Sequence, residues 1–188
     1  MKNLLHTLSL SLLATAAPAA IISFDLTGTA GAGLLAGNEP GAVVGGSGGE
    51  IGAGITFDDA INLLTINVGW GSSQGFTDLS SAANNSHIHG PTANNNGNGF
   101  TQTAGVAFTL TRSSSAVTGG IFSPNTVTLS AAQATDLLNG KFYINLHTAN
   151  NGGGEMRGFL VQSPVPEPAS ALFGMVAVGA LALRRRRA

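Results

Sequence analysis

The sequence predicts an all-β fold, an antiparallel Greek-key-like sandwich or barrel with one short helix. Roughly seven or eight short runs of alternating apolar residues are separated by polar turns, as in strands that bury one face. Only one segment carries helix-capping signals, so strands and helices do not alternate as they do around a parallel sheet. The chain of 188 residues is 9% charged and contains 27 glycines, which suits many tight turns between strands.

The N-terminal part of the domain predicts three strands. The first is Ile21–Gly28, which alternates weakly. The glycine- and alanine-rich stretch Gly31–Gly49 is expected to form a long mobile connection or an irregular edge. Two apolar runs follow, Glu50–Phe57 and Leu63–Trp70, and the polar residues between them predict a hairpin.

The middle of the chain continues the strand pattern. Thr77–Ile88 leads into a strand end, and the asparagine-rich Gly90–Gly99 is expected to be a loop. Further strand candidates are Gly105–Arg112, Val117–Ile121 and Thr126–Leu129. These short strands add to the antiparallel sandwich and do not suggest a second domain.

One short helix is expected after Ser130, followed by the last hairpin. Ser130 is a favourable N-cap residue, and Gln133 stands three residues later, as a capping box requires. Asn139 and Gly140 tolerate the left-handed geometry that ends a helix. Residues 141–149 and 155–162 then form the clearest hairpin of the chain, joined by an asparagine- and glycine-rich turn.

The first 19 residues have the pattern of a secretory signal peptide. A basic start, Met1–Asn3, precedes the apolar run Leu4–Ala16. Ala17 and Ala19 supply the small residues of a cleavage site. We therefore expect a signal helix over residues 1–19, export through the inner membrane, and a folded domain over residues 20–163.

Residues 164–188 combine three features at the C-terminus. They are a Pro-Glu-Pro motif, a short apolar run and an arginine cluster: Pro166, Glu167, Pro168, Ala169–Leu183, Arg184, Arg185, Arg186 and Arg187. A helix of about fifteen residues spans about 22 Å, less than the about 30 Å of a bilayer core. The arginines are expected to stay cytoplasmic. A plain membrane anchor is the alternative to a removable signal.

This C-terminal segment resembles a PEP-CTERM sorting signal. The resemblance implies transient membrane insertion of the C-terminal hydrophobic helix and processing by an exosortase-type enzyme. It also implies delivery to the cell surface or extracellular matrix. The expected partners are then this processing enzyme and extracellular polysaccharide or surface proteins.

Between these two ends the chain is acidic. Residues 20–163 carry three basic and eight acidic side chains, a net charge of −5, whereas four of the eight basic residues are the terminal arginines. An acidic domain lacks the basic surface that binds nucleic acid, and anionic lipid surfaces repel it. The chain contains no cysteine, so no disulfide contributes to its stability.

Three histidines are the candidate functional residues of the domain. His87 and His89 are two residues apart in a predicted strand, so both imidazoles lie on one face. His147 lies on the polar face of the last hairpin. Such imidazoles suit copper or zinc, with Glu155 as a candidate fourth ligand. The alternative is a hydrogen-bonded histidine cluster that requires no cofactor.

The segments around these histidines resemble the CHRD domain, the module named for chordin. The matching motifs are Ser86–Pro91, Phe142–Thr148 and Gly154–Gly158, with weaker similarity in Asn38–Pro40 and Glu50–Trp70. The resemblance covers most of Ser23–Val161. It implies a β-sandwich-like fold and no established activity for the bacterial members.

Other functional patterns are weaker. Gly31–Ala36 has the glycine spacing of a dinucleotide site but lacks the following helix and acidic residue. Asp58 and Asp59 suggest calcium, yet adjacent acids in a hairpin are more often turn formers. Glu155 and Arg157 share one face of a strand. They form either an exposed ion pair worth under about 1 kcal/mol or hydrogen bonds to the neighbouring histidine-bearing strand.

Together these observations favour a non-enzymatic, exported protein with a structural or interaction role. No nucleophile elbow and no pair of catalytic carboxylates frames a reaction. Three histidines without a disulfide or a second histidine-rich loop do not match copper/zinc superoxide dismutase. The alternative function is a copper- or zinc-binding surface protein that uses His87, His89 and His147.

Overall fold

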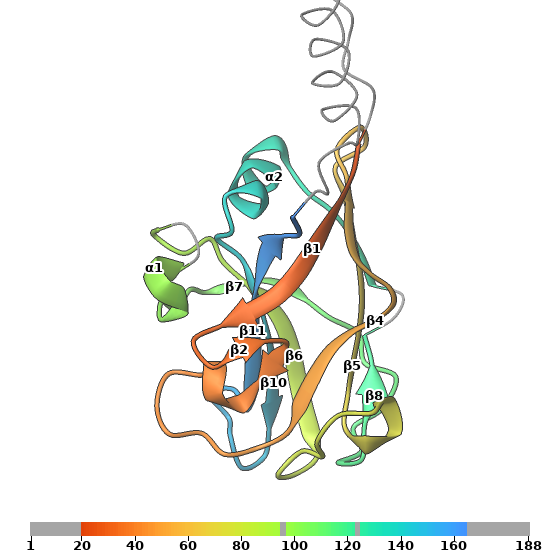
Figure 1. Ribbon diagram of the computed structural model, residues 1–188, viewed down its shortest axis with the longest axis vertical. Coiled ribbons are helices and arrows are strands. Elements are labelled where there is room, and N and C mark those ends of the chain that lie inside the picture. Colours follow the sequence, from red (N-terminus) through yellow and green to blue (C-terminus); the bar gives the residue numbers. More distant parts are fainter. Residues whose placement is uncertain (1–19, 95–96, 123–124, 165–188) are drawn as a thin grey trace, which may run out of the picture.

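The computed structural model describes residues 20–94, 97–122 and 125–164 (Figure 1). The expected signal peptide, with Ala17 and Ala19, lies outside the described residues. The same holds for residues 165–188 of the expected sorting segment, with Pro166, Glu167, Pro168 and the arginine cluster. Within the described ranges, no helix has both the length and the apolar character needed to cross a membrane.

The described residues form the predicted all-β fold, in which every strand pairing is antiparallel. One layer is centred on the hairpin of β4 (Ser47–Asp58) and β5 (Leu63–Trp70). Two short strands, β8 (Gly120–Ile121) and β9 (Asn125–Thr128), extend it on the far side of β5. The predicted hairpin is therefore confirmed, with β4 starting three residues earlier than expected.

The other layer contains the strands that carry the histidines. Its order is β11 (Met156–Gln162), β10 (Tyr143–Thr148), β6 (Ala83–His89) and β7 (Val106–Thr109). β1 (Ile21–Gly28) joins the two layers, because its first residues pair with β4 and its last residues pair with β11. The chain crosses between the layers several times, which gives the Greek-key-like connectivity.

The hydrophobic core lies between these layers and uses one face of each strand. The β4–β5 layer contributes Ile55, Phe57, Leu64, Ile66 and Trp70, and the β10 layer contributes Ile88, Ile144, Leu146, Met156 and Leu160. Side chains alternate across a strand, so the residues between these core positions on β6, β10 and β11 lie on the opposite face. That opposite face holds the three histidines.

Of the two alternatives for Gly31–Gly49, the loose connection was wrong, because this stretch is tied into the sheet, and the irregular edge agrees with the position of its first short strand at the end of the strand order. It contains β2 (Gly31–Ala32), β3 (Leu34–Leu35) and the 3-10 helix η1 (Ala36–Asn38). β3 pairs with both β4 and β11. The buried amide of Asn38 donates to the backbone oxygens of Gly33 and Arg157, at 3.2 and 3.0 Å. These hydrogen bonds, one of them to a residue 119 positions away in sequence, fix a segment whose glycine- and alanine-rich composition alone predicts a loose connection.

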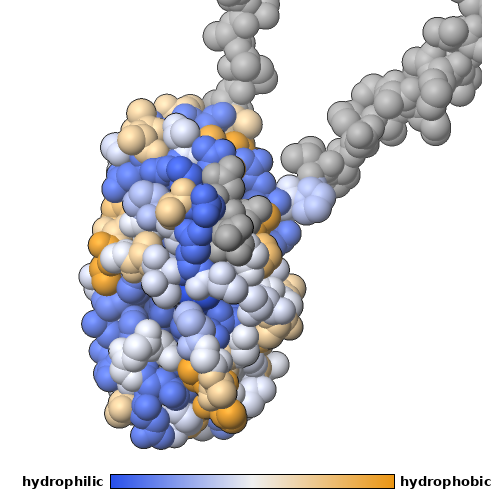
Figure 2. Space-filling view, turned by 90° about the vertical axis from the view of Figure 1, so that its left-hand side faces the viewer, coloured by the Kyte–Doolittle hydropathy of each residue, from blue (hydrophilic) through white to orange (hydrophobic). Residues whose placement is uncertain are grey.

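Short helical turns interrupt the predicted loops. The asparagine-rich loop after β6 ends in α1 (Gly97–Phe100), where a plain loop was expected. A further 3-10 helix, η2 (Ser72–Gln74), follows β5. On the face that Figure 2 displays, hydrophilic residues predominate and hydrophobic residues form small separate groups.

The helix α2 (Ala131–Leu138) occupies the predicted position and has the predicted capping box. The Ser130 hydroxyl accepts from the Gln133 backbone N–H at 3.3 Å, and the Gln133 side chain accepts from the Ser130 N–H at 2.9 Å. Ala134 and Leu137 of this helix are buried, and Leu137 packs in the core. The capping box therefore fixes the start of a helix that closes one end of the sandwich.

Replacing Ser130 by alanine is expected to lower the free energy of unfolding by about 1 kcal/mol, because the side-chain acceptor for a backbone N–H at the helix start is lost. Chemical denaturation measures the change. Ser130→Asp is the matched control, since aspartate caps about as well as serine. An equal loss in both variants would contradict a capping role.

Candidate functional site

The polar face of the β10 layer brings the predicted site residues together. His87 and His89 extend from β6, and His147 extends from the adjacent strand β10. The antiparallel register places Tyr143 opposite His89 and Asn145 opposite His87. The H-x-H spacing and the alternation in β10 are therefore enough to gather three imidazoles on one surface once the two strands pair.

The three imidazoles converge. One candidate ligand atom from each histidine can be chosen so that all three lie within 4.8 Å of one another. The ring centroids are 5.1 Å apart for His87 and His147, 5.4 Å for His87 and His89, and 5.8 Å for His89 and His147. Residues 60 positions apart along the chain thus form one cluster.

Two backbone carbonyls orient the rings. The Nδ1 atom of His89 is 2.9 Å from the carbonyl oxygen of Ala104, and the Nδ1 atom of His147 is 3.0 Å from that of Gly152. A carbonyl oxygen only accepts, so each Nδ1 carries the proton and each Nε2 keeps its lone pair. This is the tautomer that a metal ligand needs, with its second nitrogen held by an outer partner.

His87 completes the cluster from the partly exposed side. Its Nδ1 atom is 3.2 Å from Nε2 of His147, so it donates to the lone pair of that ring. Zinc–nitrogen bonds of about 2.0–2.1 Å with tetrahedral angles separate two ligand nitrogens by about 3.3 Å. Nδ1 of His87 and Nε2 of His147 already have this spacing, and ion binding through both would require His87 to carry its proton on Nε2 instead of Nδ1. The three candidate ligand atoms lie within 4.8 Å of one another, so the cluster would contract slightly around an ion.

The surroundings favour neutral imidazoles. Burial lowers the pKa of His87, and the neighbouring His147, His89 and Arg112 lower it further. Burial also lowers the pKa of His89, and this outweighs the opposing effect of its hydrogen bond to Ala104. Both rings are therefore uncharged at neutral pH and offer lone pairs instead of positive charge.

Glu155 does not belong to this cluster, contrary to the sequence prediction of a fourth ligand. Its carboxylate is fully buried and accepts from the backbone N–H of Gly46 at 2.9 Å and of Ser80 at 2.7 Å. The hydroxyls of Ser80 and Thr148 donate as well. Burial alone would raise the pKa of Glu155, but these hydrogen bonds outweigh it and lower the pKa. The carboxylate is a saturated structural anchor.

Arg157 is buried as well, so the predicted exposed ion pair with Glu155 was wrong. The side chain is 1% exposed, and each guanidinium nitrogen donates to a backbone carbonyl. The acceptors are Asn38 at 2.6 Å, Gln102 at 3.0 Å and Phe100 at 2.6 Å. The guanidinium also lies over the Tyr143 ring, 5.1 Å from its centroid. The alternative prediction holds for Glu155, whose carboxylate accepts from Thr148 of the histidine-bearing strand β10.

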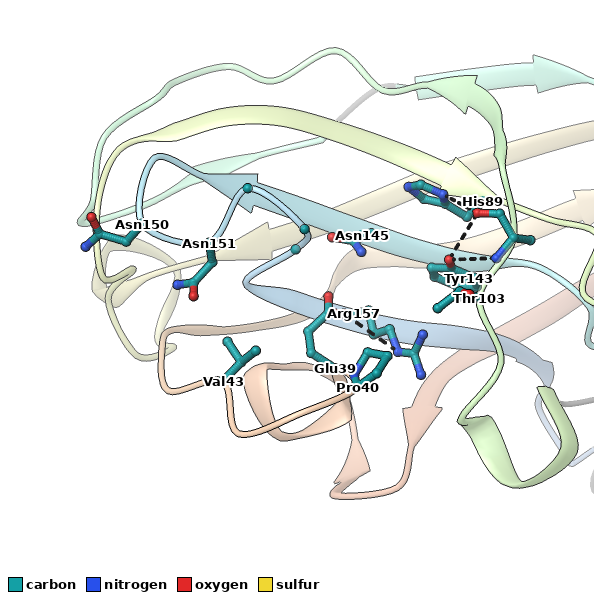
Figure 3. Close-up of a pocket in the computed structure, with 14 residues that line it drawn as sticks. Glu39, Pro40, Val43, His89, Thr103, Tyr143, Asn145, Asn150, Asn151 and Arg157 are labelled. Atoms are coloured by element: carbon teal, nitrogen blue, oxygen red, sulfur yellow. Dashed lines mark hydrogen bonds and ion pairs between the residues drawn. The ribbon is translucent and has the colours of Figure 1, made fainter.

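A pocket of about 470 Å³ lies beside the histidine cluster (Figure 3). The loop Asn150–Gly154 and the segment Glu39–Val43 form its sides, and His89 and Asn145 lie in its wall. Gly154 has a φ of +136°, and a Cβ there would come within 2.6 Å of the Asn145 amide and the Glu39 carboxylate. Any side chain at this position would therefore collide with both polar groups.

Glu39 is the principal site residue that the sequence does not reveal. It is 7% exposed, and burial raises its pKa to about 7, with only partial compensation from the charge of Arg157, 4.0 Å away. Its position in Asn38-Glu39-Pro40, part of the weaker CHRD-like similarity, was the one signal that pointed to it. For Asn145 the alternation of the strand predicted a place on the same polar face as His147, but no role in a site.

Glu39 is expected to make the protein less stable as the pH rises. The pKa in the folded state is about 7, above the ordinary value of 4.5, so the folded state binds the proton more tightly. The contribution of this carboxyl to the free energy of unfolding is fully present below pH 4.5, the pKa in the unfolded chain. It is lost as the pH rises through about 7, the pKa in the folded state, by up to about 3 kcal/mol. Urea denaturation at about pH 5 and about pH 8, compared with the same measurement on a Glu39→Gln variant, measures this loss, because the lowered pKa values of His87 and His89 change the stability in the opposite direction.

A Glu39→Gln variant should lose most of this pH dependence because it removes the titrating group. Asp59→Asn removes one charge from an exposed turn and serves as the control. An unchanged pH profile in Glu39→Gln would contradict the assignment of this carboxyl.

The remaining sequence patterns have ordinary structural roles. Asp58 accepts from the Ala60 N–H at 3.0 Å and Asp59 accepts from the Ala20 N–H at 2.8 Å, as turn-forming acids do. The glycine spacing of Gly31–Ala36 falls in β2, β3 and the start of η1. Neither pattern adds a residue to the histidine cluster.

A comparison with protein families matches residues 32–160 of the chain to the CHRD domain. The matched range is more than half of the chain and includes all three histidines, Glu39 and Arg157. No curated protein matches the chain. No solved structure matches it either.

Proposed function

The chain belongs to the CHRD domain family, and from this premise we propose that it is a surface protein that binds one copper or zinc ion through His87, His89 and His147. The observation that supports the proposal is the convergence of three imidazoles, two of them oriented by backbone carbonyls. Imidazole nitrogens are preferred ligands of zinc and copper.

The proposed role is binding or structural support, not catalysis. An ion held by β6 and β10 would cross-link two neighbouring strands and the loops that carry Ala104 and Gly152. Binding of an ion to the folded state alone stabilises that state. The second candidate is a metal-free histidine cluster, favoured by the direct His87–His147 hydrogen bond at 3.2 Å.

Metal titration of the purified, chelator-treated protein separates these two candidates. We expect one zinc or copper ion per chain and a higher unfolding temperature, with stabilisation of about 2.7 kcal/mol at a free-ion concentration about 100 times Kd. Magnesium is the control ion, because it prefers oxygen ligands. No stoichiometric binding under excess zinc and copper would leave only the metal-free cluster.

We also propose that residues 1–19 direct export and that residues 164–188 direct sorting by an exosortase-type enzyme. The domain would then reach the cell surface or extracellular matrix, where polysaccharide or surface proteins are its partners. The order of the Pro-Glu-Pro motif, the short apolar run and Arg184–Arg187 supports this proposal.

Deleting residues 166–188 is expected to change where the protein accumulates in cells that export it. Cell fractionation and surface labelling measure the distribution. The four substitutions Arg184→Ala to Arg187→Ala form a second, milder variant that keeps the apolar run. Unchanged surface display of the deletion variant would count against the sorting signal.

A further inference from the structure

The pocket beside the histidine cluster contains polar groups that the metal site does not use. Two residues that line it each have a buried side-chain oxygen without a hydrogen-bond partner among the described residues, Oε1 of Glu39 and Oδ1 of Asn145. The residues are 7% and 3% exposed. In Figure 3 the Asn145 side chain and the Glu39 carboxylate extend from opposite sides toward the same space. Buried polar atoms are rarely left unpaired in native proteins, so a partner for both is expected.

A third unpaired atom, Nε2 of His89, belongs to the histidine cluster and is not needed here. Both remaining atoms are acceptors when the Glu39 carboxyl is ionised, whereas the protonated carboxyl can also donate. A molecule that satisfies them must therefore donate hydrogen bonds.

The side-chain donors of Arg157, Asn150 and Asn151 are already engaged, which disfavours an anion. Each nitrogen of the Arg157 guanidinium donates to a backbone carbonyl. The amide nitrogens of Asn150 and Asn151 donate to Ser80, at 3.1 and 3.0 Å. An anionic ligand would meet the Glu39 carboxylate and find no uncommitted cationic donor among these groups.

The charge balance also disfavours a cation. The Nε atom of Arg157 lies 4.0 Å from Oε2 of Glu39, so a buried positive charge already faces this carboxylate. A second cation in the same pocket would be repelled by the guanidinium. A ligand with neutral hydrogen-bond donors is the remaining class. Hydroxyl groups are such donors, and they can hydrogen-bond to a carboxyl whether it is protonated or ionised.

We propose that this pocket binds a neutral, hydroxyl-rich ligand, a single sugar unit, through Glu39 and Asn145. The volume of about 470 Å³ lies within the range of small-molecule sites. Two hydroxyls of one sugar ring can donate to the two unpaired oxygens. This site is distinct from the metal proposal and stands without it, since neither oxygen belongs to the three-histidine ligand set.

Nuclear magnetic resonance titration of the chelator-treated full-length protein tests the proposal. The probes are D-glucose, D-galactose, D-mannose and glycerol, with methylammonium and inorganic phosphate as charged alternatives. We expect at least one sugar to shift the amide signals of Gly152, Gly153 and Gly154 in a saturable way. Phosphate and methylammonium should leave these signals unchanged.

Two variants locate the binding. Glu39→Gln is expected to weaken sugar binding about tenfold, the size of one lost hydrogen bond to a charged acceptor. Thr103→Trp places a bulky group at the exposed rim of the pocket and should block binding while leaving both acceptors in place. Asp59→Asn removes a distant charge and should bind as the parent does. Circular dichroism checks that each variant is folded.

Several results would overturn the proposal. Saturation by methylammonium or phosphate but by no sugar would give the pocket a different ligand class. No response to any probe would mean that water alone pairs with the two oxygens. Sugar binding that persists unchanged in Thr103→Trp would place it elsewhere. Because metal is removed first, a failed zinc titration does not affect any of these results.

Discussion

An Arg157→Ala variant is expected to lose about 3–5 kcal/mol of stability. Removing the guanidinium leaves the buried polar groups that it contacts without a partner. The guanidinium is almost fully buried and pairs with three backbone carbonyls from η1, α1 and the loop that follows α1. Its removal leaves these carbonyls unpaired and the Glu39 carboxyl without its compensating charge. Unpaired buried groups account for most of the expected loss.

Urea denaturation followed by circular dichroism measures this effect. Lys141→Ala is the matched control, because Lys141 forms a partly exposed ion pair with Asp136 at 2.9 Å. That pair should contribute less than about 1 kcal/mol. A loss from Arg157→Ala no larger than that of the control would contradict the anchoring role of the guanidinium.

A His147→Ala variant is expected to bind zinc more than about 100-fold more weakly than the parent, because one of three protein ligands is lost. Nε2 of His147 lies 3.2 Å from Nδ1 of His87, and the His147 ring centroid is 5.1 Å from that of His87 and 5.8 Å from that of His89. Isothermal titration calorimetry measures the affinity.

Asn85→Ala is the control for this substitution. Asn85 lies opposite His147 in the register of β6 and β10, is exposed and supplies no candidate ligand. Its zinc affinity should match that of the parent. Equal affinities in His147→Ala and the parent would contradict the three-histidine site.

Local patterns predicted the elements that surround the histidines. Alternating apolar residues located β1, β4, β5, β10 and β11 closely, and Ser130 with Gln133 located the helix α2. The H-x-H spacing predicted that His87 and His89 share a face. Their convergence with His147 also depended on β6 pairing with β10, which the alternation alone does not specify.

Long-range contacts decided what local patterns could not. Gly31–Gly49 has the composition of a loop, but Asn38 ties it to β11, 119 residues away in sequence. Glu155 and Arg157 have the charges of surface residues, yet backbone N–H and C=O groups from distant loops surround both. The identity of one charged residue does not indicate which distant backbone groups will surround it. The burial of Glu39 likewise depends on contacts between segments that are far apart in sequence.

The strand β10 connects the two proposed sites. His147 serves the histidine cluster, and Asn145, two residues before it, faces the adjacent pocket. The loop Asn150–Gly154 also serves both, through the Gly152 carbonyl on His147 and through its place in the pocket wall. One hairpin therefore positions the residues for an ion and for a neutral ligand side by side.

X-ray absorption spectroscopy of the zinc-loaded protein tests the metal site most directly. We expect one zinc ion per chain, with three imidazole nitrogens at about 2.0–2.1 Å and one further light-atom ligand. His147→Ala should lose this three-imidazole signature. A protein that retains no stoichiometric zinc, or zinc surrounded by oxygen ligands alone, would contradict the proposal that His87, His89 and His147 bind the ion.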